Sequence, residues 1–229
     1  MDSLEKLETL QARILHRITE LEISLYGQKL ASVSLSSDDP TARAGDTMEL
    51  RLTAILIVLG VDDFLFKRVP LDYYDRSLES RRDILGAPSI EHLCKSIVLV
   101  NTQAPASVTD CSDRNNSKYY VVVIQYMARL NAENIKNFVY ALNDRKIPKK
   151  RFNFRLAPEE DSQELTGYGH NAVTCFGSKT NIPVILDEAI TKLEPNFFWL
   201  GGGEVDLKLG IRTPQFITAI KPFIVSCST

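Results

Sequence analysis

The sequence is poor in the residues that cross-link small proteins or bind metals. It has four cysteines and three histidines in 229 residues. No two cysteines form a CxxC pair, and no histidine lies at metal-ligand spacing from a cysteine. We therefore expect no metal and no cofactor, and we expect reduced thiols, as in a cytoplasmic protein. A chain of this length can bury a hydrophobic core without such cross-links.

The sequence also lacks a strong charge of one sign and a long hydrophobic run. The formal net charge is −2, so no global positive field indicates nucleic-acid binding, although a local basic patch is sufficient for RNA. The longest apolar run, residues 52–61, is interrupted by Thr53 and Gly60. A bilayer requires about 20 apolar residues, so we expect no membrane association. The first residues show no basic segment followed by an apolar one, and we expect no secretory signal.

Common catalytic motifs are missing as well. No GxSxG, HExxH or Walker A sequence occurs, and the glycine spacing of a dinucleotide site is absent. Cys175 follows His170 by five positions, which admits a thiol nucleophile as a minor alternative. Such pairs usually meet across a fold, however, and no third orienting residue is evident.

Residues 3–30 predict one amphipathic helix. Its inward positions alternate steps of three and four along Leu4, Leu7, Gln11, Ile14, Ile18, Leu21 and Leu25. The pattern fits equally a coiled coil, which pairs with a second copy or docks a partner such as a synthetase, and a helix packed on its own domain. We expect an N-terminal helix over 1–31, a flexible Ser/Asp-rich linker over 32–47 and a folded domain over 48–229.

Strands and helices alternate irregularly within this domain. Two apolar runs, residues 96–100 and 118–127, are typical of buried strands. Further strands are expected at 172–175, 184–186, 197–200 and 204–209, and helices at 47–60, 131–143 and 213–220. Because no regular βαβ repeat is present, the pattern predicts an α+β fold with a mixed sheet.

Three features are candidates for a functional site. Lys95 lies where a predicted helix gives way to an apolar strand; most such lysines are surface residues, but a buried one directs its donors at a ligand oxygen. Gly167 and Gly169 precede His170 and Asn171 in a segment where backbone N–H groups can approach a ligand. The third candidate, residues 201–203, is a run of glycines for which a hairpin turn is the more common interpretation.

A basic stretch completes the candidates. Residues 146–151 contain Lys146, Lys149, Lys150 and Arg151, and Arg155 follows closely. Such a stretch can contact phosphates, although most runs of this kind are solvated loops.

Several long segments, taken in order, resemble the eukaryotic branch of the YbaK / prolyl-tRNA-synthetase-associated family of aminoacyl-tRNA deacylases. These segments are residues 93–98, 118–126, 153–158, 165–168 and 197–208. The resemblance covers roughly residues 48–227. It implies a mixed, barrel-like sheet surrounded by helices. It also implies a trans-editing hydrolase that acts on the acceptor end of mischarged aminoacyl-tRNA, with a small amino acid such as alanine or cysteine on a proline-type tRNA.

The resemblance also assigns site residues. The near-invariant lysine of the family matches Lys95, and in the family this lysine is thought to contact the terminal ribose or the ester region of the substrate. The glycine-rich pocket strand of the family matches residues 170–177. Together with the glycine-containing segments, this implies a catalytic Lys95 and the substrate-binding residues Gly167, Gly169, His170, Asn171, Thr174, Cys175, Gly201 and Gly202.

The chain departs from the family pattern opposite this lysine. Bacterial members carry glycine where this chain has Asn171 and Ala172, and proline where it has Cys175. An alanine places a methyl group in a wall that the substrate carbonyl should approach, and the loss of proline frees the backbone. The sequence therefore leaves an alternative: a catalytically weakened module of the same fold that binds a tRNA end or a synthetase.

Overall fold

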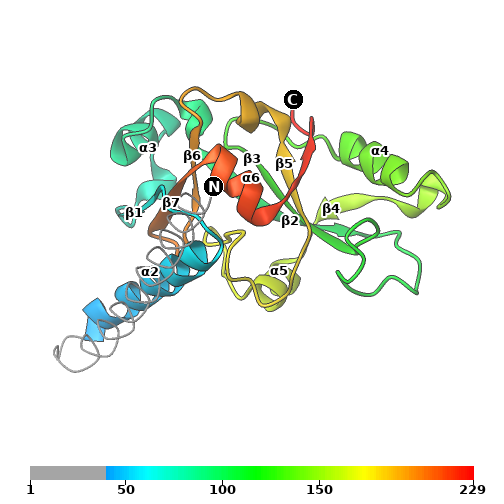
Figure 1. Ribbon diagram of the computed structural model, residues 1–229, viewed down its shortest axis with the longest axis horizontal. Helices are drawn as coiled ribbons and strands as arrows, with labels where there is room; N and C mark the ends of the chain where they lie inside the picture. Colours follow the sequence, from blue (N-terminus) through cyan, green and yellow to red (C-terminus); the bar gives the residue numbers. More distant parts are fainter. Residues whose placement is uncertain (1–39) are drawn as a thin grey trace, which may run out of the picture. The chain divides into compact units, whose positions relative to one another are not determined.

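The computed structural model describes the backbone from Pro40 to Thr229 and the side chains from Met48 onward (Figure 1). The helix expected over 1–31 and the first part of the expected linker lie outside the described residues. Helix α2 runs from Pro40 to Val58 and therefore occupies the rest of the segment expected to be a linker. Proline suits the first turn of a helix, where its missing N–H has no partner to lose. Residues 47–229 form one compact unit.

A five-stranded mixed sheet lies at the centre of this unit, with the order β4-β2-β3-β5-β8. Its strands are β2 (Cys94–Asn101), β3 (Tyr119–Gln125), β4 (Phe154–Leu156), β5 (Val184–Asp187) and β8 (Phe223–Val225). β3 pairs antiparallel with β2 and parallel with β5. The expected α+β fold with a mixed sheet is confirmed.

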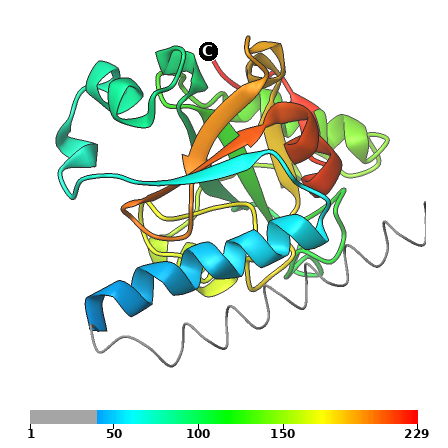
Figure 2. The same cartoon turned by 60° about the vertical axis from the view of Figure 1, so that its left-hand side comes forward.

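A second, three-stranded antiparallel sheet packs beside the first, with the order β1-β7-β6 (Figures 1 and 2). Its strands are β1 (Phe64–Arg68), β6 (Phe197–Gly201) and β7 (Leu207–Arg212). β6 and β7 form a hairpin, so the hairpin expected around residues 201–203 is confirmed. A single bridge between Leu93 and Trp199 connects the two sheets, which do not close into a barrel within the described part of the chain.

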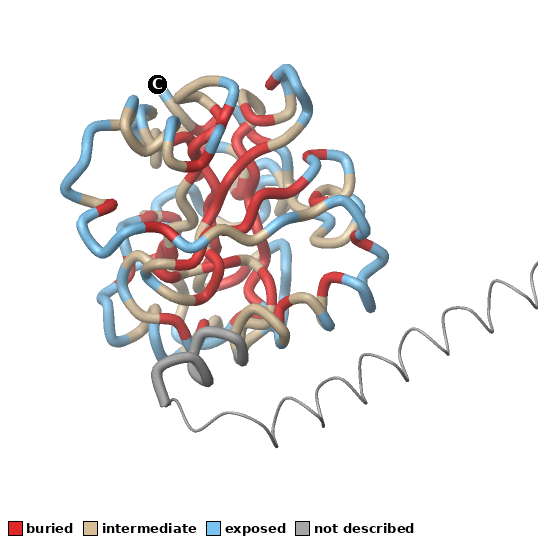
Figure 3. The backbone as a smooth tube through the Cα atoms, turned by 90° about the vertical axis from the view of Figure 1, so that its left-hand side faces the viewer, coloured by how far each residue is buried: buried red, intermediate tan, exposed pale blue. Residues whose placement is uncertain are grey.

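The central strand β3 explains why the sequence shows a continuous apolar run there. Val121 and Val123 face a core shared with β6, β7 and α2. Tyr120, Val122 and Ile124 point the other way, into a second core under helix α4 (Ala132–Leu142). A strand buried on both faces has no polar face to alternate with the apolar one. Figure 3 shows the buried strands running through the middle of the domain.

Short helices cover the remaining faces. The 3₁₀ turns η1 (Tyr73–Asp75) and η2 (Ile90–His92) and helix α3 (Leu78–Leu85) surround a third cluster at Trp199. Two other short elements are the 3₁₀ turns η3 (Lys149–Arg151) and η4 (Glu188–Lys192). Helix α5 spans Glu159–Thr166, and helix α6 spans Thr213–Ile220 with Pro214 in its first turn.

The strand expected over residues 172–175 is wrong. Ala172 and Thr174 are buried and Val173 and Cys175 are less so, which imitates the period of a strand. The backbone nevertheless turns at Asn171 (φ 63°), and no strand pairs with the segment among the described residues. The segment is part of an irregular loop, residues 167–177, called the pocket loop below.

Phe216 of α6 ties this loop to the sheet. Its fully buried ring makes edge-to-face contacts with Phe176 of the pocket loop and Phe198 of β6, at 5.8 and 5.2 Å between centroids.

We expect Phe216→Ala to lower the free energy of unfolding by about 3–5 kcal/mol, because it opens a cavity among packed rings. Urea denaturation measures this. The exposed Leu71→Ala is the control, expected within about 0.5 kcal/mol of wild type; equal losses in both variants would contradict the prediction.

Candidate active site

A cavity of about 340 Å³ lies between the edge of β2, helix α5 and the pocket loop. This volume lies within the range of about 300–1,000 Å³ that is usual for small-ligand sites. Its lining residues are Tyr74, Lys95, Ser96, Ile97, Val98, Tyr126, Leu156, Ala157, Glu159, Ser162, Tyr168, Gly169, His170, Asn171, Val173 and Gly201. The structure therefore brings together five of the residues implied by the sequence: Lys95, Gly169, His170, Asn171 and Gly201.

The cavity exists because strand β4 is short. It pairs with β2 only at Leu99–Asn101, and the Ala157 N–H then donates to the Val98 carbonyl at 2.9 Å. The preceding stretch of β2, residues 95–97, has no described strand beside it on that edge and borders the cavity instead. An uncovered strand edge offers backbone groups as well as side chains to a ligand.

Lys95 is half-buried at this edge. Its Nζ atom donates to the Tyr126 carbonyl at 3.4 Å and lies 5.7 Å from the centre of the Tyr126 ring. Burial lowers the pKa of Lys95 because the charged ammonium loses hydration. No carboxylate forms an ion pair with it among the described residues, so its positive charge is available to a ligand oxygen.

The pocket loop supplies backbone donors opposite Lys95. Within the described part of the chain, no group accepts a hydrogen bond from the N–H of Gly169, His170 or Asn171. All three residues line the cavity. Consecutive backbone N–H groups without an internal partner form a suitable site for an oxygen that carries negative charge.

Contacts from other elements hold the loop in place. The hydroxyls of Tyr168 and Tyr74 donate to the carbonyls of Phe176 and Asn171, each at 2.7 Å. Arg51 of α2 donates to the Gly177 carbonyl at 2.8 Å, and the Gly203 N–H donates to the Ala172 carbonyl at 3.0 Å. Side-chain donors thus satisfy three of these four loop carbonyls, and the backbone of the β6–β7 hairpin satisfies the fourth.

Gly201 allows β6 to meet this loop. A Cβ atom at Gly201 would lie 2.5 Å from the Val173 carbonyl oxygen, which is too close for any side chain. Gly202, in contrast, is buried away from the cavity, where its N–H donates to the Leu207 carbonyl at 2.9 Å. The first glycine of the run therefore shapes the cavity, and the second closes the β6–β7 hairpin.

Three other implied residues do not line the cavity. Gly167 ends helix α5 in a left-handed conformation, the usual role of a glycine at a helix C-terminus. Thr174 is fully buried, and its hydroxyl has no hydrogen-bond partner among the described residues. The Cys175 sulfur lies 3.8 Å from the Ser96 hydroxyl.

The surroundings of Cys175 do not activate it as a nucleophile. Burial raises the pKa of its thiol to about 12, so the group stays protonated at neutral pH. The thiolate, not the thiol, is the reactive form. His170, the partner considered for it, is exposed at the cavity mouth and makes no hydrogen bond to this sulfur.

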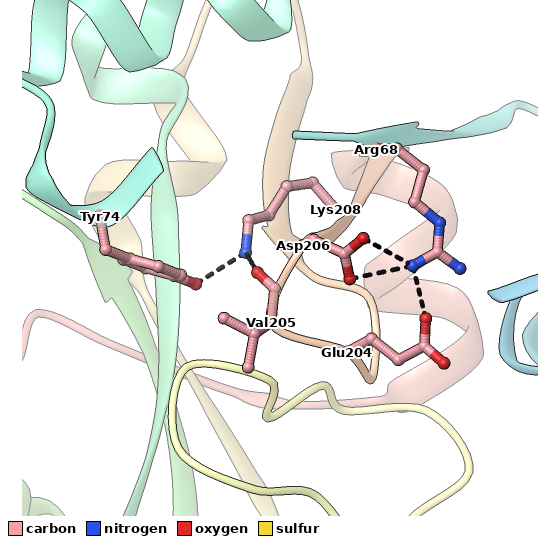
Figure 4. A network of polar contacts seen from close by, with 6 residues as sticks. All are labelled: Arg68, Tyr74, Glu204, Val205, Asp206 and Lys208. Atoms are coloured by element: carbon pink, nitrogen blue, oxygen red, sulfur yellow. Dashed lines mark hydrogen bonds and ion pairs between the residues drawn. The ribbon is translucent and has the colours of Figure 1, made fainter. Parts of the chain in front are cut away.

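Sequence reasoning missed the aromatic and basic residues behind the cavity. Tyr74 and Tyr126 line it, and Lys208 of β7 donates to the Tyr74 hydroxyl at 2.7 Å and to the Val205 carbonyl at 2.8 Å (Figure 4). Burial lowers the pKa of Lys208 to about 8. No signal in the sequence singles out Lys208, because a lysine between two leucines usually marks the solvated face of a strand.

The comparisons with known proteins bear on this site directly. A family model described as an aminoacyl-tRNA editing domain matches residues 85–219. This chain belongs to that family. The matched stretch contains Lys95, the pocket loop and Lys208, and membership makes the protein an aminoacyl-tRNA deacylase, as the sequence predicted. No curated protein sequence matches the chain.

Solved structures share the fold of this editing domain. One, described as a candidate trans-editing enzyme for prolyl-tRNA synthetase, is 19% identical with a TM-score of 0.60, over 84% of this chain and 99% of that one. A hypothetical protein is 19% identical with a TM-score of 0.56, over 77% of this chain and 98% of that one. Among the described helices of the editing domain, none is long and apolar enough to cross a membrane.

The close approach at Gly201 gives a prediction. We expect Gly201→Ala to lower the free energy of unfolding by about 1–3 kcal/mol, because a backbone carbonyl has to move away from the new methyl group. The matched control is Gly169→Ala, where an added Cβ meets nothing within 4 Å. Thermal unfolding of both variants measures the difference. A Gly201→Ala variant as stable as Gly169→Ala would show that the two backbones are not in contact.

Proposed function

We propose that the cavity binds the aminoacylated 3′ end of a mischarged tRNA and hydrolyses the ester, with a small amino acid such as alanine or cysteine on a proline-type tRNA as the substrate. One observation carries the proposal. In the described structure, one cavity of about 340 Å³ is lined by Lys95, whose ammonium group forms no ion pair, and by three consecutive residues whose backbone N–H groups have no acceptor. Such a set of donors suits an ester carbonyl that becomes an oxyanion.

In this mechanism the two sides of the cavity hold different parts of the substrate. Lys95 binds the ribose or the ester oxygen, since its ammonium group lies at the open edge of β2. The N–H groups of Gly169, His170 and Asn171 stabilise the charge that develops on the carbonyl oxygen. Among the described residues that line the cavity, Glu159 alone carries a carboxylate, which suits the protonated α-amino group of the amino acid.

The chemical step needs only water. The oxygen of a water molecule, activated by a neighbouring substrate hydroxyl, attacks the ester carbon and forms a tetrahedral intermediate. The intermediate expels the ribose oxygen, which takes up the proton that the water has given up. The products are the free amino acid and the deacylated tRNA. Because esters are reactive, positioning and charge stabilisation account for the catalysis.

In this proposal the cavity selects a small amino acid through its walls. Ile97, Val98 and Leu156 supply apolar surface around the site. Each additional methylene on a substrate changes discrimination in such a pocket by about 1–3 kcal/mol, so a larger side chain is rejected by exclusion.

The test is deacylation of alanyl- and cysteinyl-tRNA that carries a proline anticodon. We expect Lys95→Ala to lower kcat/KM about 100-fold, the order of loss for one donor that stabilises charge at the reacting ester. The control is Lys192→Ala, an exposed lysine in a surface ion pair with Glu188, expected to keep the wild-type rate. Equal rates for wild type and Lys95→Ala would disprove the role of Lys95.

The alternative function, a binding module with weak turnover, rests on the departures at Asn171, Ala172 and Cys175. Wild-type protein that binds tRNA but leaves every mischarged tRNA intact would establish it. Recruitment of a synthetase, or of a second copy, through residues 1–31 belongs to this proposal. Loss of partner capture after deletion of these residues would support it, and unchanged capture would count against it.

We propose that the basic stretch contacts the phosphates of the acceptor stem. Lys149 is paired with Glu133 and Lys146 with Asp144, but Lys150, Arg151 and Arg155 are exposed without an ion pair in the described structure. Arg155 immediately precedes Leu156 in the cavity wall. A tRNA whose end enters the cavity therefore passes close to this stretch.

We expect alanine at Lys150, Arg151 and Arg155 together to weaken tRNA binding and to reduce its salt dependence. The slope of log K against log salt should fall by about 0.7–0.9 for each phosphate that is no longer neutralised. Filter binding at several salt concentrations measures the slope. The control removes the same total charge elsewhere, with alanine at Arg82, Arg129 and Lys192. Identical slopes for both triple variants would place the acceptor stem on another surface.

A further inference from the structure

Among the described residues, Lys208 is a buried cation that forms no ion pair, although the charge of Asp206 acts on it from farther away. Its side chain is on β7, and the residue is 3% exposed. The carboxylate of its chain neighbour Asp206 is engaged by Arg68 at 2.9 Å instead, as Figure 4 shows. A buried charge of this kind costs folding energy, and an apolar residue of similar size usually serves a fold better.

One hydrogen bond of the Lys208 ammonium group connects it to Tyr74, which lines the cavity. The Tyr74 hydroxyl lies 2.7 Å from the Asn171 carbonyl, which can only accept a hydrogen bond. The hydroxyl therefore uses its single proton there and accepts its second bond from the Lys208 ammonium, also at 2.7 Å. Burial raises the pKa of Tyr74, so this hydroxyl keeps its proton.

The Tyr74 hydroxyl bonds the pocket loop where its backbone turns. Asn171 adopts a left-handed conformation there, φ 63°, which asparagine takes up more readily than most residues other than glycine. The N–H group of the accepting peptide is that of Ala172, and it donates to the Gly169 carbonyl at 3.1 Å, within the loop. The N–H groups of Gly169, His170 and Asn171, which come before it, have no acceptor in the described structure. The hydrogen bond from Tyr74 therefore joins this peptide to the rest of the fold at the point where the loop borders the cavity.

We propose that Lys208 is a positioning residue of the editing site: through the Tyr74 hydroxyl it fixes the Asn171 peptide and the orientation of the N–H groups in the pocket loop. Lys208 does not line the cavity and acts only through Tyr74. Its charge polarises the tyrosine O–H and strengthens the bond to the carbonyl, as charged donors do in buried chains. The inference rests on the proposed function, since these N–H groups receive the substrate carbonyl there.

The experiment compares Lys208→Met, Tyr74→Phe and the double variant in the full chain. Tyr73→Phe is the matched control: it removes a hydroxyl from the same aromatic cluster, 5.1 Å from the Lys208 ammonium by ring centre, and that hydroxyl makes no hydrogen bond to a described side chain. Hydrogen exchange by mass spectrometry follows residues 167–177, with α4 as a reporter of the intact fold. Steady-state deacylation gives kcat and KM.

We expect exchange in the pocket loop to become about tenfold faster in both single variants, and kcat to fall about tenfold with a smaller change in KM. The double variant should match Tyr74→Phe, because both changes break one chain of hydrogen bonds. Tyr73→Phe should resemble wild type. Exchange in α4 should not change in any variant.

Two results would overturn the proposal: unchanged loop exchange in folded Tyr74→Phe, or additive losses of kcat in the double variant. Tyr74→Phe is nearly isosteric and decides the question if Lys208→Met does not fold. Wild-type protein that deacylates no mischarged tRNA would refute the proposed function alone, because loop exchange reports the positioning role independently of turnover.

Discussion

The close approach of the pocket loop to the end of β6 is the constraint on which the site depends. Val173 approaches Gly201 so closely that only a glycine fits. This approach places the loop opposite the uncovered edge of β2 and defines the depth of the cavity. Phe216 then fixes the loop from the side of the core, through its packing against Phe176 and Phe198.

Two lysines that form no ion pair in the described structure lie at different depths around the cavity. Lys95 is half-buried at the edge of β2 and offers its charge to a ligand. Lys208 is buried behind Tyr74 and donates a hydrogen bond to the hydroxyl of that residue. In each case burial lowers the pKa, because the ammonium group gives up hydration. This loss of hydration lowers the stability of the fold. In our proposals it is offset in function, because each lysine is a charged hydrogen-bond donor at or behind the cavity.

Much of the fold could be predicted from local patterns, and the failures have local causes. The buried strand β3 was recognisable from its apolar run and helix α4 from its helical pattern, and the structure shows Asn131 as the cap of that helix. β4 and β8 were missed because three residues carry too little periodicity. Residues 172–175 alternate in burial as a strand does, but what they meet across the gap is the backbone at Gly201 rather than a neighbouring strand. Family resemblance, not spacing, indicated Lys95.

The amino-acid sequence was enough to establish the fold class, the family and the two segments that face each other across the cavity. These properties depend on apolar patterning and on motifs that are continuous in the chain. The three-dimensional arrangement was needed to separate Gly201 from Gly202, to remove Cys175 from the candidates for catalysis and to reveal Lys208 behind Tyr74. Such distinctions depend on burial and on contacts between residues far apart in the chain, such as Tyr74 and Lys208, and no local pattern records them.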